Sequence, residues 1–182
     1  STQVASNIRE MTRLQLLVEV LQRTHRMLDE ADQRRHAEAF APYLKGNAGQ
    51  YTYRIKREAY EEHLRQAGEL MHQLVDALAE RYANEAAYQV LARVFDEHFI
   101  VEESALRAKT GEDLTADSLQ SPDDWEATYR RKRDEDHIGY VTNVTETSAP
   151  ENDFQLIVKV QTESNNTDDA AMLAEVLPEL KE

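Results

Sequence analysis

Residues 58–82 read EAYEEHLRQAGELMHQLVDALAERY, and this stretch decides the fold of the first part of the chain. Its apolar residues recur every three or four positions, a spacing that places their side chains on one face of an α-helix. The spacing therefore predicts one long amphipathic helix with a buried stripe. The stripe consists of Tyr60, Leu64, Ala67, Met71, Leu74, Val75, Leu78 and Tyr82.

Two further amphipathic helices are predicted on either side of this one. The first covers residues 11–28, and the other covers residues 85–109. Between residues 28 and 58, Pro42 and the sequence GNAG at 46–49 predict a loop, and residues 51–55 alternate as a short extended stretch would. Three such helices with short connections predict an antiparallel bundle over residues 1–115. Their inward residues are Leu14, Leu17, Val18, Leu21 and Leu28 in the first helix, and Tyr88, Leu91, Phe95, Phe99 and Leu106 in the last.

The pattern changes in residues 116–182. Ser121 followed by Pro122 and two aspartates is typical of a helix start, and it predicts a short helix over residues 122–131. Residues 138–145 are rich in β-branched side chains, and residues 154–161 have an apolar residue at every second position. Two such runs so close together predict an antiparallel β-hairpin.

A last helix is predicted to start at Asp168 and Asp169, and its inward face is expected to hold Ala170, Leu173, Ala174 and Leu177. The whole chain is therefore expected to be α+β and mostly α. A two-stranded hairpin with one helix is marginal in water, and its unpaired edges can accept another strand. We therefore expect self-association into a homo-oligomer.

Composition limits the class of protein. Of the 182 residues, 31% are charged and 41% are apolar, which predicts a soluble globular chain. The sequence has no apolar run long enough for a bilayer and no signal layout at residues 1–4, so we expect no membrane contact and a cytoplasmic location. The absence of cysteine excludes disulfides and thiolate metal sites. No glycine-rich phosphate loop or Ser-His-Asp order indicates a small-molecule substrate.

The formal net charge of -14 predicts that the chain as a whole repels DNA, so any DNA contact must come from a local basic patch. One dense cluster, Arg130, Arg131, Lys132 and Arg133, is the candidate DNA-binding site. These side chains could contact phosphates. The other interpretation is a solvated charge run that the acidic residues 134–136 offset.

Several other groups have two interpretations each. The aspartate pairs 123–124 and 168–169 are expected to cap helices rather than to bind metal. Glu69 and His72 have the Glu-x-x-His spacing of di-metal bundles, although partner glutamates at matching spacing are missing. The tyrosines could form a surface on which bases stack, but their spacing favours packing within the bundle. These are Tyr51, Tyr53, Tyr60, Tyr82 and Tyr88.

A longer pattern supplies a family resemblance. Residues 121–132 (SPDDWEATYRRK), 139–147 (GYVTNVTET), 150–152 (PEN), 155–157 (QLI) and 166–170 (NTDDA) follow one another in order. This string resembles the middle of the DDE transposases of bacterial insertion sequences, and residues 93–99 (RVFDEHF) are similar to part of that family's helical insertion. The resemblance covers nearly the whole chain. It implies an RNase H-like catalytic fold that a helical insertion splits after the first strand, with residues 116–182 as a partial core.

For the parent protein, the resemblance implies DNA cleavage and strand transfer in transposition, with three carboxylates that hold two Mg²⁺ or Mn²⁺ ions. The first of these aspartates directly precedes a Ser-Thr pair in the family, so the match to Ser1 and Thr2 places it before residue 1. The other two are expected after Glu182. We therefore expect an internal fragment without catalytic residues or a metal of its own, inactive by itself and weak in DNA binding.

Two alternatives belong to other classes. The chain could be a helical protein-interaction module that oligomerises through the bundle or through exposed strands. A di-metal-binding helical bundle around Glu69 and His72 is the remaining alternative.

Overall fold

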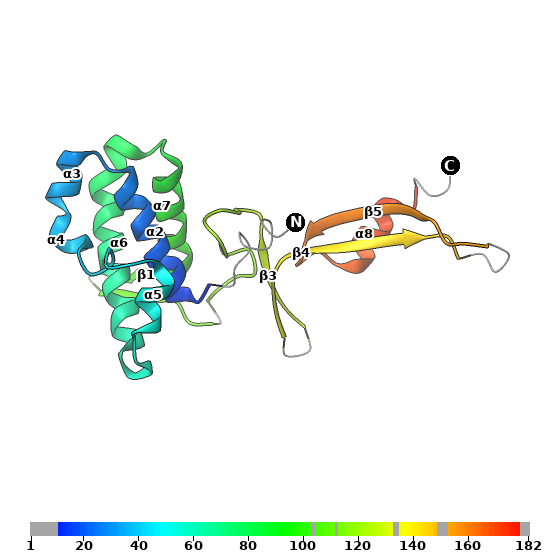
Figure 1. Cartoon of the computed structure of the whole chain (residues 1–182), viewed down its shortest axis with the longest axis horizontal. Helices are drawn as coiled ribbons and strands as arrows, with labels where there is room; N and C mark the ends of the chain where they lie inside the picture. The colour runs from blue at the N-terminus through cyan, green and yellow to red at the C-terminus, as the bar shows by residue number, and fades with distance from the viewer. Residues whose placement is uncertain (1–10, 103–104, 112, 133–134, 149–152, 179–182) are drawn as a thin grey trace. The chain divides into compact units, whose positions relative to one another are not determined.

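The computed structural model describes residues 11–102, 105–111, 113–132, 135–148 and 153–178. The fold is mixed α+β, and its described strands form two small antiparallel sheets (Figure 1). The chain divides into two units between Trp125 and Glu126, further along than the boundary expected after residue 115. Unit 1 contains α2 (Arg13–Met27), α3 (Glu30–Arg35), α4 (Ala37–Phe40), α5 (Ala48–Tyr53), η1 (Arg57–Ala59), α6 (Tyr60–Tyr82), α7 (Ala86–His98), β1 (Phe99–Glu102) and β2 (Ala105–Ala108). Unit 2 contains β3 (Thr128–Lys132), β4 (Glu135–Glu146), β5 (Ile157–Ser164) and α8 (Asp169–Val176).

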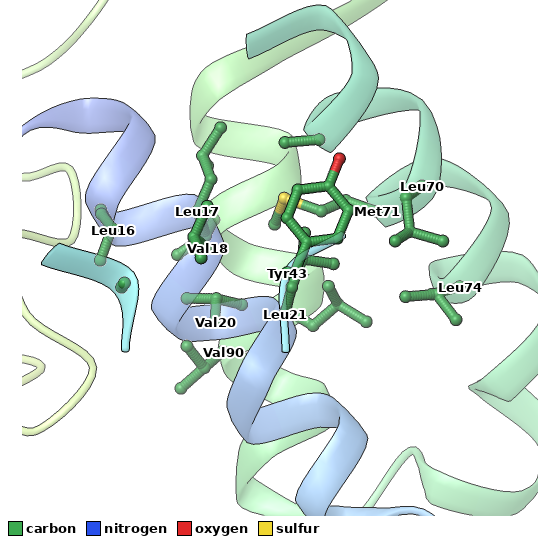
Figure 2. Close-up of a cluster of buried hydrophobic side chains, with 14 of the residues drawn as sticks. Leu16, Leu17, Val18, Val20, Leu21, Tyr43, Leu70, Met71, Leu74 and Val90 are labelled. Atoms are coloured by element: carbon green, nitrogen blue, oxygen red, sulfur yellow. The ribbon is translucent and has the colours of Figure 1, made fainter. Parts of the chain in front are cut away.

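Three long helices form the core of unit 1. Helix α2 packs against both α6 and α7, and α6 packs against α7. Most residues of the predicted stripes face this core, and the described chain is about half helical, less than the mostly α content that the sequence analysis expected. Figure 2 shows part of this cluster, in which Leu17, Val20 and Leu21 of α2 lie together with Met71 and Leu74 of α6, and Val90 of α7 lies beside Val20. Each fully buried side chain of this size contributes about 1.5–3 kcal/mol to the free energy of unfolding.

The prediction of an extended stretch at residues 51–55 is wrong, because a short helix, α5, ends at Tyr53. Gly46 turns the chain with a φ of 135°, a value that favours glycine. Asn47 then caps α5, and its side chain and that of Gln50 each accept a hydrogen bond from the other's backbone N–H. This reciprocal capping box satisfies two N–H groups at the start of the helix, which favours helix over strand.

The third predicted helix is too long. Helix α7 ends at His98, and residues 99–102 and 105–108 form the antiparallel strands β1 and β2 instead. Phe99, Ile100 and Val101 are aromatic and β-branched residues that favour a strand over a helix. Arg13 of α2 stabilises the start of β1 and the end of β2, because its guanidinium donates hydrogen bonds to the carbonyl oxygens of both His98 and Lys109.

The short helix predicted at residues 122–131 is not formed. The backbone N–H of Asp124 donates to the Ser121 carbonyl over 3.3 Å, and the N–H of Asp123 donates to Ser121 Oγ over 3.2 Å. The Ser121 hydroxyl and carbonyl, which would have capped the predicted helix, therefore form a tight turn instead. Residues from Thr128 onward pair with β4 instead, and threonine and tyrosine at 128 and 129 favour that strand.

The sheet of unit 2 confirms the predicted hairpin and adds one strand. Strand order is β3-β4-β5, and both pairings are antiparallel. Strand β3 pairs with the first part of β4, up to Gly139, and β5 pairs with the rest, from Tyr140 to Glu146. Helix α8 follows β5 as predicted, and the Asp168 side chain caps it by accepting from the N–H of Ala170.

The two faces of this sheet differ in an unexpected way. Helix α8 covers the polar face, because Asn143 donates to Met172 Sδ over 3.4 Å and Gln161 donates to Glu175 over 2.8 Å. Within the described residues the opposite face is open, so Val144 and Val160, which are cross-strand partners, are 54% and 58% exposed.

The face predicted for α8 is also wrong. Leu173 and Leu177 are 55% and 42% exposed, whereas Met172 and Val176 are buried. The helix carries two candidate apolar stripes, and its packing in unit 2 buries the one that the sequence analysis did not select.

Candidate functional site

The predicted DNA-binding cluster lies on β3. Arg130 and Arg131 belong to this strand and Lys132 ends it, whereas Arg133 lies outside the described residues. The strand register places Arg131 opposite Asp136, and it places Lys132 opposite the glutamate that begins β4. The register therefore sets acidic positions of β4 across from basic positions of β3.

A buried asparagine holds the base of the same hairpin. Asn165 is 4% exposed, and its Nδ2 donates to the His137 carbonyl over 2.7 Å. Its Oδ1 accepts from Thr128 Oγ1 over 2.8 Å, and its carbonyl accepts from Arg130 Nη1 over 3.2 Å. Asn165 therefore links β3, β4 and the end of β5. The guanidinium of Arg130 is positioned by this contact, which makes its role at least partly structural.

Two of the four aspartates that the sequence analysis weighed as metal ligands have structural roles. The carboxylate of Asp123 forms an ion pair with Arg23 at 2.8 Å, and that of Asp168 caps α8. Among the described residues, no group of three or more histidine, aspartate and glutamate side chains is placed to hold a metal ion.

Glu69 and His72, the Glu-x-x-His pair of α6, both contact other side chains of unit 1. Glu69 pairs with Arg65 of the same helix. The ring of His72 stacks on Phe95 at a centroid distance of 5.2 Å and an interplanar angle of 3°. Both residues therefore contribute contacts within or on the bundle.

A groove of about 910 Å³ opens on unit 1 where the start of α2 lies beside α5. Its lining consists of hydroxyl, amide and aromatic side chains with one cation, Arg54, and none of the described lining residues is acidic. The capping box of α5 fixes two of the amides, because Asn47 Oδ1 and Gln50 Oε1 accept from backbone N–H groups at 2.8 and 3.2 Å. Each amide oxygen accepts one hydrogen bond in the capping box, and each NH₂ group is a donor that a ligand can meet.

The sequence around this groove is unusual for so acidic a chain. Residues 39–57 contain no aspartate or glutamate but do contain Lys45, Arg54, Lys56 and Arg57, whereas the whole chain has 35 acidic residues in 182. Tyr53 lies in the same segment and is 92% exposed. The sequence analysis missed this cluster because the cations are interrupted by other residues. The lack of acids over residues 39–57 is the signal that could have revealed it.

The five tyrosines that the sequence analysis grouped together separate in the structure. Tyr82 and Tyr88 are buried in the core of unit 1, and Tyr51 and Tyr60 are partly buried against it, as the packing interpretation predicted. Tyr53 differs, since its ring projects almost entirely into solvent.

One buried histidine is notable for its surroundings. His98 is 6% exposed, and neither ring nitrogen has a hydrogen-bond partner among the described residues. Burial, together with the nearby positive charges of Arg13 and Lys109, lowers the pKa of His98 from 6.5 to about 4. His98 is therefore neutral at pH 7 and forms part of the core of unit 1, not part of an open site.

Comparison of the chain with protein-family models, with curated proteins and with solved structures finds no match. Within the described ranges, none of the helices combines the length and the apolar character needed to cross a membrane.

Proposed function

We propose that the chain is part of a DDE transposase of a bacterial insertion sequence and that unit 2 contributes to its RNase H-like core. The ordered resemblance over residues 121–170 is the basis of the proposal. The order of elements in unit 2 supports it, because a strand that contains Gly139 and Tyr140 pairs with a strand that begins at Ile157, and a helix capped by Asp168 follows. In this proposal unit 1 corresponds to the family's helical insertion.

The open apolar face of the β4–β5 sheet is the structural observation that carries the proposal furthest. Tyr140, Val144, Val158 and Val160 alternate onto this face, and they are 39%, 54%, 49% and 58% exposed. Exposed apolar patches of this kind mark surfaces that bury themselves against further structure. A larger catalytic core, with additional elements against this face, would provide that cover.

The divalent metal ions of the proposed family do not fit the described residues, since no ligand set is formed there. We therefore assign no catalytic step to this chain. In the proposal, the carboxylates that hold Mg²⁺ or Mn²⁺ belong to other parts of the parent protein, and Arg130 and Arg131 approach the phosphates of its DNA substrate.

The proposal is tested by the coding sequence on both sides of residues 1–182. We expect an aspartate codon directly before that of Ser1, and a strand-forming segment with an aspartate soon after that of Glu182. Expression of the whole reading frame then allows a direct assay, in which the parent cleaves the ends of its element in the presence of Mg²⁺. Unrelated sequence on both sides, in a frame that encodes a folded protein, would refute the proposal.

Self-association through strand β5 is a second candidate function, and a specific observation favours it. Among the strands that the structure describes, β5 pairs with β4 on one side and has no partner on the other, and Ile157 at its start is 64% exposed. In a two-fold antiparallel pairing of two β5 strands about Gln161, Lys159 of each copy lies opposite Glu163 of the other. Such cross-strand ion pairs stabilise the pairing and fix its register.

A further inference from the structure

We propose that the groove beside α5 binds single-stranded nucleic acid, with Tyr53 stacked on a base and the cations Arg54, Lys56 and Arg57 against the phosphates. The site lies entirely within unit 1 (Figure 1, where α5 is drawn in cyan). It does not depend on the transposase proposal, because it is argued from the chemistry of this surface alone.

The exposure of Tyr53 is the first argument. Three other tyrosines of unit 1 use their hydroxyl groups within it: that of Tyr51 lies 2.8 Å from His63 Nδ1, that of Tyr82 donates to Asp32, and that of Tyr88 donates to the Val75 carbonyl. Tyr53 is 92% exposed and makes no such contact among the described residues. An exposed ring at the end of α5 offers an open π-face to a base, and stacking on aromatic rings is how proteins commonly bind single strands.

The local charge is the second argument. Arg54, Lys56 and Arg57 are exposed, and no described carboxylate forms an ion pair with any of them. Before these cations the nearest acidic residue along the chain is Glu38, and after them Glu58 directly follows Arg57. Residues 39–57 hold four cations and no carboxylate, so this segment carries a local positive excess, although the net charge of the whole chain is -14.

The hydrogen-bonding groups of the groove are the third argument. Arg54 and the oriented NH₂ groups of Asn47 and Gln50 are donors, and donors match the acceptor atoms of phosphates and base edges. In a duplex the faces of the bases are already stacked on one another, so Tyr53 could not reach them. This surface therefore favours an unpaired strand over a duplex.

The test is the affinity of the full chain for a fluorescein-labelled deoxythymidine oligonucleotide of about 20 nucleotides, measured by fluorescence anisotropy at about 50 mM salt. We expect binding that weakens as salt rises, and weaker binding to a duplex of the same length. Tyr53→Ala should reduce the affinity by roughly 5- to 100-fold, which corresponds to the loss of one stacked base. Tyr53→Phe should retain the affinity, because stacking requires the ring and not the hydroxyl.

Charge-reversal variants provide the matched comparison. Arg54→Glu and Lys56→Glu should each lower the affinity and flatten its dependence on salt, because each removes a phosphate contact. Arg34→Glu changes the net charge equally at an exposed position on α3 and should have a much smaller effect. Far-UV circular dichroism checks that each variant is folded. The proposal is overturned if the oligonucleotide does not bind at low salt, if Tyr53→Ala binds as tightly as the wild type, or if Arg34→Glu is as harmful as Arg54→Glu.

Discussion

Acidification should destabilise unit 1 through His98, whose ring is buried beside Arg13 without a hydrogen-bond partner among the described residues. In the unfolded chain its pKa is near 6.5, and in the folded chain it is about 4. Because the folded pKa is the lower one, the unfolded chain binds this proton first as the pH falls. The contribution of neutral His98 to the free energy of unfolding is therefore complete above pH 6.5, and it is lost as the pH falls from 6.5 to 4.

The magnitude follows from the difference between these two pKa values. One pH unit of difference corresponds to about 1.4 kcal/mol, so the full effect is about 3 kcal/mol in the free energy of unfolding. Most of this loss falls above pH 4. Below that pH, carboxylates with lowered pKa values contribute, among them Asp113 with a pKa of about 2.

The assay is urea unfolding of the full chain, followed by far-UV circular dichroism at pH values between 7 and 4. His98→Leu is the matched variant, because leucine fills a similar buried volume and cannot take up a proton. We expect the wild type to lose stability relative to this variant as the pH falls, with the difference reaching about 3 kcal/mol near pH 4. An NMR titration of the His98 ring provides a direct reading of its pKa.

Two results would refute this reasoning. The first is an equal loss of stability in the wild type and in His98→Leu, since the other histidines and all carboxylates are common to both proteins. The second is a pKa near 6.5 for His98 in the folded chain, which would mean that the ring is hydrated and not buried.

Three further substitutions test the packing, the ion pairs and the strand edge. Gly68→Ala should lower the free energy of unfolding by about 1–3 kcal/mol, because a Cβ at this position would overlap the buried ring of Phe99. A variant as stable as the wild type would contradict this packing. Asp32→Ala should lower the free energy of unfolding by about 1–3 kcal/mol, because the Asp32 side chain is buried (2% exposed) and accepts a hydrogen bond from the Tyr82 hydroxyl. Urea unfolding measures the effect of both substitutions. Val160→Lys should weaken self-association in light scattering, and an unchanged mass would exclude pairing through β5.

The long helices could be predicted from the sequence because the spacing of their apolar residues fits only an α-helix with a single buried face. In α6 the residues Leu64, Met71, Leu74 and Leu78 define a single stripe, and all four are buried. The pairing of β4 with β5 was predictable for the same kind of reason, since two runs of β-branched residues with a short connection have few other arrangements.

Element ends were less predictable, because local signals compete there with long-range pairing. Ser121 and Pro122 form a sound helix start, yet the segment turns and continues into β3, whose partner strand lies further along the chain. Helix α7 stops at His98 because β1 pairs with β2. A pattern within one segment cannot weigh a partner that lies elsewhere in the chain.

The sequence by itself determined the helical bundle, the hairpin and the strongly negative charge, because apolar spacing and composition are properties of the chain. Only the tertiary structure decided that Tyr53 is exposed while Tyr82 and Tyr88 are buried. It also decided that α8 lies on the polar face of its sheet. Burial depends on what packs against a side chain, and that is settled only when segments distant in sequence meet.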